Sequence, residues 1–264
     1  MADPDWNPWR RLLALPNESR TKTIVVAFLV ASVCALLVSG ATVLLRPIQT
    51  ANRAAEEQIR IDALVAGIPG MADLLGQEGG TLSTVVIDLA TGQATTAVTP
   101  DTLAAALADT SNWTALSPEA DIAGLGRRPN FAQVFLLRDG NDISLVLLPI
   151  SGMGYGGRID AFIALRGDMN TIAGITITGH SETPGIGGRI EEPAWQAGFP
   201  GTELRDDGGD LRFAVARTQA SGPYEVDGIT GATRTGLGVT GMVRFWLGPD
   251  GYGPLIHAVE RGEF

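Results

Sequence analysis

One uncharged stretch near the N-terminus restricts the fold of this 264-residue chain more than any other feature. Residues 23–45 read TIVVAFLVASVCALLVSGATVLL. A run of about 23 apolar residues is long enough to cross the hydrocarbon core of a bilayer as a helix. It is longer than the apolar core of a signal peptide, and no good cleavage site follows it. The stretch therefore predicts a retained transmembrane helix.

Basic residues on either side of this run indicate its direction. Lys and Arg precede it at Arg10, Arg11, Arg20 and Lys22, and follow it at Arg46, Arg53 and Arg60. The slight excess before the run favours a cytoplasmic N-terminus. The predicted organisation is a cytoplasmic segment over residues 1–22, a transmembrane helix over 23–45, a stalk helix over 46–68 and a periplasmic domain over 69–264.

Composition excludes several classes of function. The only cysteine, Cys34, lies inside the apolar run, so the outer domain has no disulfide, no thiolate zinc site and no iron–sulfur cluster. The only histidines are His180 and His257, and no metal site is expected. The formal net charge of −10 makes nucleic acid an unlikely partner.

Strand-like runs dominate the segment beyond the membrane. Residues 84–89 form the first, and a turn and a second short run at 94–98 suggest a hairpin. Further apolar, β-branched runs occupy 131–137, 143–150, 159–166 and 171–178. A short helix is expected over 99–108, and another near the C-terminal end. These elements predict an α+β domain with a mostly antiparallel sheet and flanking helices.

A glycine-rich loop at 152–157 fits the G-x-G-x-x-G pattern of dinucleotide-binding folds. That fingerprint requires a helix to open directly after it. The following residues, RIDAFIALRGD, alternate as a strand does, so dinucleotide binding is rejected. The loop is predicted to be a hairpin connection, and its glycines would still let it form the wall of a ligand site.

A second motif, Asp227-Gly228-Ile229-Thr230-Gly231-Ala232-Thr233, precedes a segment with helical spacing. A helix is expected to begin near Thr233 and to end at Gly248-Pro249. Its first turn would offer free N–H groups and a positive dipole end to a phosphate, with Arg234 beside it. From the residues alone, a turn followed by a threonine helix cap is the favoured interpretation, and an anion site is the alternative.

A third segment is rich in glycine and reads Glu182-Thr183-Pro184-Gly185-Ile186-Gly187-Gly188. Such a composition predicts a shaped loop. A plain surface loop and a ligand-binding loop are equally compatible with it. The preceding His180 is expected to be a hydrogen-bonding surface residue rather than a metal ligand.

These motifs together resemble a known family. The D-G-x-[ST]-G-A-T pattern is similar to the flavinylation motif of the FMN-binding domain in sodium-translocating NADH:quinone reductases and in the related Rnf complexes. The resemblance extends over nearly the whole chain, through Leu148–Gly152, the 182–188 loop, Pro193-Ala194-Trp195 and the FWLGPDGYGP ending, and is strongest to the C subunit of the reductase. The chain departs from the family after the modified threonine, where Arg234-Thr235-Gly236 replaces a small or aliphatic residue and Thr-Ser.

The resemblance implies a covalent cofactor. In the family, a flavin transferase that uses FAD and magnesium joins FMN to the last threonine of the motif by a phosphoester, which corresponds to Thr233. The implied binding residues around it are Asp227, Gly228, Thr230, Gly231, Ala232, Glu182, Thr183, Gly185, Ile186 and Gly187. Ile186 would cover the isoalloxazine, and Arg158, Asp160 and Glu182 are candidates for tuning the ring. A second SGAT sequence at Ser39–Thr42 lacks the Asp-Gly and lies in the apolar run, so no FMN is expected there.

The implied function is electron relay within a bacterial inner-membrane complex, with no catalysis by the chain alone. Its implied partners are other subunits of the reductase, the flavin transferase during maturation and the lipid bilayer. Two alternatives remain: the G subunit of an Rnf-type complex, and a flavin-free membrane-anchored binding or assembly module.

Overall fold

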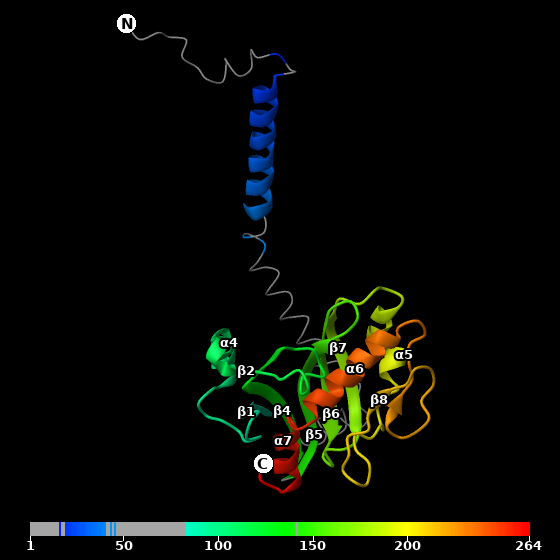
Figure 1. Cartoon of the computed structure of the whole chain (residues 1–264). Helices are drawn as coiled ribbons and strands as arrows, with labels where there is room; N and C mark the ends of the chain where they lie inside the picture. The colour runs from blue at the N-terminus through cyan, green and yellow to red at the C-terminus, as the bar shows by residue number, and fades with distance from the viewer. Residues whose placement is uncertain (1–15, 17–18, 41–42, 44, 46–82, 141) are drawn as a thin grey trace. The chain divides into compact units, whose positions relative to one another are not determined.

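The computed structural model describes residues 16, 19–40, 43, 45, 83–140 and 142–264. The chain divides into two compact units, residues 1–58 and 59–264. In the first unit, the helix Arg20–Gly40 has a mean hydropathy of 2.5 and no buried residues in its apolar window (Figure 1). It is long and apolar enough to cross a membrane, as the sequence predicts. The stalk helix over 46–68 lies outside the described residues, and the four-part division of the chain stays a prediction.

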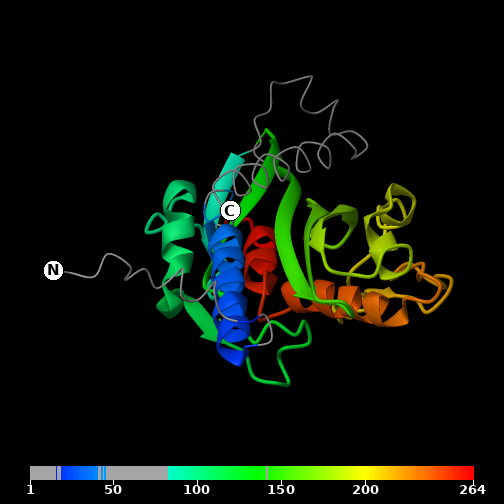
Figure 2. The ribbon, with the colours of Figure 1, turned by 90° about the horizontal axis from the view of Figure 1, so that it is seen from above.

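The C-terminal domain is built on a five-stranded antiparallel sheet in the order β1-β4-β5-β6-β7. Its strands are β1 (Ser83–Asp88), β4 (Phe131–Asp139), β5 (Asp142–Met153), β6 (Arg158–Arg166) and β7 (Ile172–His180). From β4 to β7, each strand pairs with the next along the chain, and β1 pairs with β4 at one edge (Figure 2). This meander confirms the expected mostly antiparallel sheet.

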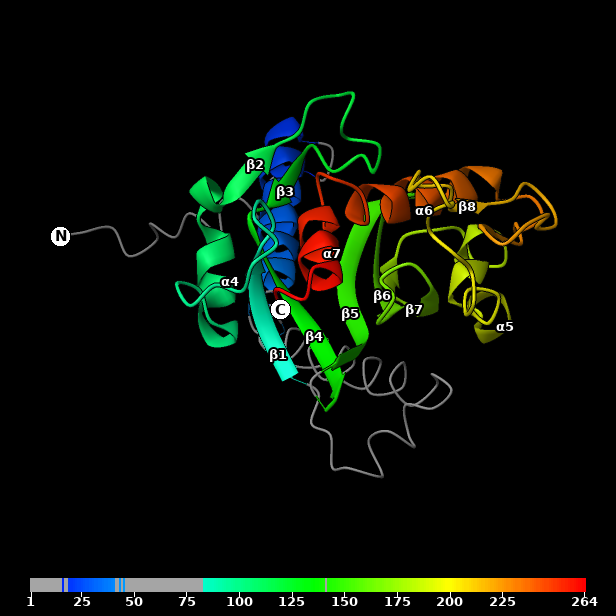
Figure 3. The ribbon, with the colours of Figure 1, turned by 90° about the horizontal axis from the view of Figure 1, so that it is seen from below.

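Two helices cover one face of this sheet (Figure 3). They are α6 (Thr233–Trp246) and α7 (Gly253–Glu260), and their apolar residues join the main core with the inward positions of the strands. Trp246 Nε1 donates a hydrogen bond to the Ser151 carbonyl at 2.7 Å, and the Tyr252 hydroxyl donates to the Pro149 carbonyl at 2.7 Å. Both bonds tie the helical layer to β5, the central strand.

The opposite face of the sheet is apolar as well. Leu137, Leu145, Leu147, Phe162, Ala164 and Ala173 form a second buried cluster, with Phe135 packed against it. Successive side chains of a strand point to opposite faces, so Leu136 belongs to the main core and Leu137 to this second cluster. Because both faces are buried, β4 and β5 read as nearly continuous apolar runs.

Shorter elements surround the sheet. They are α4 (Pro100–Ala108), η1 (Thr110–Asn112), β2 (Trp113–Ala115), β3 (Arg127–Pro129), η2 (Gly187–Glu191), α5 (Pro193–Gln196), β8 (Ala214–Val215) and β9 (Glu225–Val226). The expected hairpin after β1 is only a single bridge between Ile87 and Ala94. The main partner of β1 is β4, with which it pairs over its whole length.

The turn between β6 and β7 depends on Asp168. Its Oδ1 accepts hydrogen bonds from the N–H groups of Asn170 and Thr171, and its Oδ2 accepts one from the Thr171 hydroxyl at 2.6 Å. Burial raises the pKa of Asp168, but the bonds from Thr171 and Asn170 and the charge of Arg166 outweigh this, so the pKa lies below its ordinary value of 3.8.

We expect Asp168→Ala to lower the free energy of unfolding by about 1–2 kcal/mol at neutral pH, because two N–H groups lose their acceptor. The carboxylate contributes fully above its unfolded pKa, and the contribution disappears as pH falls through the lowered folded pKa. Urea unfolding at several pH values measures this. Asp168→Asn, which keeps an acceptor oxygen, is expected to lose less stability and to remove the part of the pH dependence that comes from this carboxylate. A difference between wild type and Asp168→Ala that does not shrink in acid would contradict it.

Candidate flavin site

Thr233 is the first residue of α6, and its side chain is exposed. The N-cap position falls on Ala232, and no side chain caps the helix. No hydrogen bond of the Thr233 hydroxyl is found within the described part of the chain. The threonine therefore does not act as the cap that its sequence position suggests. Its oxygen faces solvent beside the free N–H groups of a 14-residue helix.

The first residues of the motif shape the approach to this helix. Asp227 Oδ1 accepts a hydrogen bond from the Ala220 N–H at 2.7 Å, and the Asp227 carbonyl accepts one from Trp195 Nε1 at 2.8 Å. The Gly228 N–H donates to the Thr218 carbonyl at 2.7 Å. The hydrogen bonds of Asp227 and Gly228 thus fix the loop that leads into α6 at Thr233. Thr230 and Gly231 are exposed at the turn, and Ala232 is buried under the helix start.

The 182–187 loop lies against the same turn. A side chain built on Gly231 would meet the Ile186 side chain at 3.9 Å, so the two positions are neighbours. Ile186 is 47% exposed, which is unusual for a large apolar residue. In the same loop, Gly185 is exposed, and the Thr183 carbonyl accepts a hydrogen bond from the Gly188 N–H at 2.9 Å. The loop therefore presents Ile186 beside the start of α6.

Glu182 is the buried centre of the site and is only 4% exposed. Its Oε2 accepts a hydrogen bond from the hydroxyl of Thr235, a residue of α6, at 2.6 Å. Its Oε1 accepts one from the Gly156 N–H, in the loop between β5 and β6, at 2.8 Å. One carboxylate thus joins the helix and both glycine-rich loops. The predicted site residues Glu182 and Ile186 come from one loop and Thr233 from another segment, and the structure places that loop against the first turn of α6.

The 152–157 sequence is a hairpin connection, as predicted, because β6 follows it and no helix opens there. A methyl group at Gly156 would overlap the Ser181 carbonyl, and one at Gly187 would overlap the Glu182 carboxylate. The absence of side chains at these two positions lets the loops pack closely together.

Sequence reasoning missed the apolar and aromatic residues of this surface. Tyr155 is 63% exposed and Leu237 is 60% exposed. The Arg234 guanidinium lies 5.4 Å from the centre of the Tyr155 ring, a cation–π contact. Leu237 stands four residues after Thr233, and residues at that spacing share one face of a helix. This spacing was the available signal for Leu237, whereas nothing local indicated Tyr155.

Other predicted residues have local partners. Arg158 and Asp160 pair with each other at 2.7 Å on the surface. His180 Nε2 lies 3.2 Å from Glu191 Oε2, and His180 Nδ1 accepts the N–H of Glu182 at 3.1 Å. His180 is thus a hydrogen-bonding residue, as expected. Among the described residues, no group of three or more His, Cys, Asp or Glu side chains could hold a metal ion.

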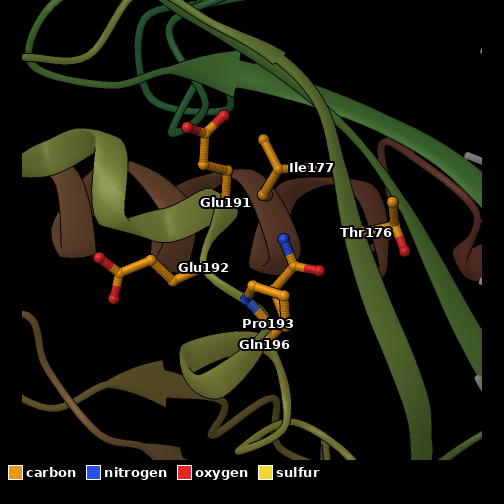
Figure 4. A pocket seen from close by; sticks show the side chains of 6 residues that line it. All are labelled: Thr176, Ile177, Glu191, Glu192, Pro193 and Gln196. Atoms are coloured by element: carbon orange, nitrogen blue, oxygen red, sulfur yellow. The ribbon is translucent and has the colours of Figure 1, made fainter. Parts of the chain in front are cut away.

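A hollow of about 420 Å³ lies elsewhere, between β7 and the η2–α5 segment (Figure 4). It is lined by Thr176, Ile177, Glu191, Glu192, Pro193 and Gln196. Its lining contains two carboxylates and no basic side chain, which disfavours a phosphate-bearing ligand. The surface beside Thr233 fits FMN better. It combines a free hydroxyl, unpaired helix N–H groups and Arg234 for the phosphate with exposed apolar side chains for the ring.

Comparison with known proteins agrees with this chemistry. The FMN-binding domain family matches residues 154–248, a range that contains most of the first glycine-rich loop, all of the second and α6. The C subunit of the Na(+)-translocating NADH-quinone reductase of Pseudomonas aeruginosa is 35% identical over 258 residues, which cover 94% of this chain and 98% of that protein. The corresponding C subunit of Yersinia pestis is 39% identical over 255 residues, covering 93% and 95%.

The crystal structure of Shewanella oneidensis NqrC is similar, with a TM-score of 0.63 and 28% identity over 72% of this chain and 88% of that chain. The chain thus combines a region that matches the FMN-binding domain with an apolar N-terminal helix. The identity and coverage of the relatives go further. The chain belongs to the family formed by the C subunits of the Na(+)-translocating NADH-quinone reductases.

Proposed function

We propose that this chain is an electron-relay subunit of a membrane-bound, sodium-translocating NADH:quinone reductase, and that it carries FMN in phosphoester linkage to Thr233. The observation that carries the proposal is the state of the Thr233 hydroxyl. It is exposed, it has no hydrogen-bond partner among the described residues, and it stands at the first turn of a long helix inside the matched FMN-binding region.

The surrounding residues would hold and orient the cofactor. Unpaired N–H groups at the start of α6 and the Arg234 guanidinium would stabilise the phosphate. Ile186, Tyr155 and Leu237 are exposed apolar side chains that would lose contact with water against the ring. The covalent bond would keep the flavin on the protein in the periplasm. Bound FMN supplies one-electron chemistry, and the protein supplies position and electrostatics.

The location and the partners follow from the same assignment. The helix Arg20–Gly40 would anchor the chain in the bacterial inner membrane, with the outer domain in the periplasm. Other subunits of the reductase would exchange electrons with the flavin, and a flavin transferase would attach it. The names of the relatives favour this complex over one of the Rnf type.

The test is a denaturing gel of the protein made in cells that contain the transferase. We expect a band that fluoresces under ultraviolet light. Mass analysis of its peptides should place FMN less one water on Thr233. A dark band from such cells would overturn the covalent assignment and support the flavin-free binding module instead.

A further inference from the structure

The buried carboxylate of Glu182 is an unusual feature for a surface site. Charged side chains are seldom buried without a partner of opposite charge. Among the described residues, no Lys, Arg or His forms an ion pair with Glu182, and its oxygens are bound only by the Thr235 hydroxyl and the Gly156 N–H. Stability alone does not favour a buried carboxylate without an ion-pair partner. Its presence therefore indicates a functional role.

The position of this carboxylate relates it to the cofactor. Thr233 and Thr235 are two residues apart in one turn of α6 and point to roughly opposite sides of it, about 200° apart. Thr233 is exposed, and Thr235 is 2% exposed and bonded to Glu182. A helix with its side chains is about 10–12 Å across, so the carboxylate lies roughly 10 Å from the attachment oxygen. Ile186 precedes Gly187, and Gly187 packs directly on the carboxylate, so the residue proposed to cover the ring is also its neighbour.

We propose that the carboxylate of Glu182 keeps a fixed negative charge behind the flavin. This charge lowers the midpoint reduction potential of the flavin. The inference rests on the proposed function. Adding an electron next to a negative charge is unfavourable, and a buried charge is screened much less by salt than an exposed one. The two hydrogen bonds hold the carboxylate in place, so its effect on the ring is constant.

The sharpest variant is Glu182→Gln, which removes the charge and keeps the shape. The amide oxygen accepts the Gly156 N–H, and the amide nitrogen donates to Thr235 Oγ1, because a hydroxyl both donates and accepts. The matched control is Glu192→Gln, which removes the same charge from a carboxylate paired with Arg189 on the surface. Thr235→Ser, which keeps the hydroxyl, is the conservative control within the network.

The experiment is a spectroelectrochemical titration of the full-length protein in detergent, after a fluorescent gel has established that each variant carries covalent flavin. We expect Glu182→Gln to shift the midpoint potential upward. Glu192→Gln and Thr235→Ser are expected to stay at the wild-type value. High salt is expected to leave the shift largely in place.

The inference is overturned if a loaded Glu182→Gln protein has the wild-type potential, or if Glu182→Gln and Glu192→Gln show equal shifts. If Glu182→Gln fails to load, the double variant Glu182→Leu/Thr235→Val replaces both partners by apolar groups and should show the same upward shift. Two folded variants without flavin would mean that Glu182 acts in attachment, which also overturns a role in the potential. A wild-type protein without covalent flavin is a different outcome, since it overturns the proposed function itself and the inference with it.

Discussion

Thr233→Ala is expected to abolish the covalent flavin completely while the domain stays folded. The substitution removes the oxygen to which the motif is proposed to attach the phosphate. Thr233 is exposed and its hydroxyl has no hydrogen bond in the described structure, so removing the hydroxyl should change the free energy of unfolding by no more than about 0.5 kcal/mol. Gel fluorescence, peptide mass and circular dichroism of the full-length protein measure the two effects separately.

Two control variants make this result specific. Thr233→Ser keeps a hydroxyl at the same place and should retain some covalent flavin. Thr42→Ala changes the second SGAT sequence, in the apolar run, and should retain all of it. A fluorescent band of normal intensity from Thr233→Ala would mean that the flavin is attached elsewhere.

The largest loss of stability is expected for Trp246→Ala. The side chain is 4% exposed, and its ring packs against those of Phe245 and Tyr252, with centroids 5.5 and 5.3 Å away. Truncation leaves a large cavity between α6 and the sheet and removes the bond to the Ser151 carbonyl. Such changes cost about 3–5 kcal/mol.

Urea unfolding in detergent, followed by circular dichroism, would test this expectation. Leu237→Ala on the same helix is the matched control, since that side chain is 60% exposed and its truncation should cost less than about 1 kcal/mol. If the two variants lost equal stability, α6 would not be anchored to β5 in the way described.

Much of the fold was predictable because its signals are local. Four strands begin and end within a few residues of the expected ranges: β4, β5, β6 and β7. Their runs of β-branched and apolar residues, bounded by turn residues, favour strands. The start of α6 at Thr233 follows from the glycines before it and the helical spacing after it. The predicted first hairpin is present only as a single antiparallel bridge, because the long partner of β1 is β4, more than forty residues later in the chain.

The site was only partly predictable, because its contacts join distant segments. The sequence pattern placed Thr233 and Ile186 on separate loops, yet nothing in it linked Glu182 to Thr235, which lies 53 residues away. Tyr155 was missed for the same reason, because its partner Arg234 comes from another element. Such pairings depend on how the loops pack against α6. The preference of neighbouring residues for helix, strand or turn does not determine that packing.

The close contact between the two glycine-rich loops has a consequence for variation in this protein. At Gly156 and Gly187, the space for a side chain is already taken by the neighbouring residues. A library of all single substitutions should therefore show its least tolerant positions at residues that contribute no functional group. Exposed residues away from these loops, such as Gln93 in the turn after β1, should accept many replacements. Selection acting on this surface would preserve the absence of side chains at these two glycines more strictly than the identity of the polar residues around them.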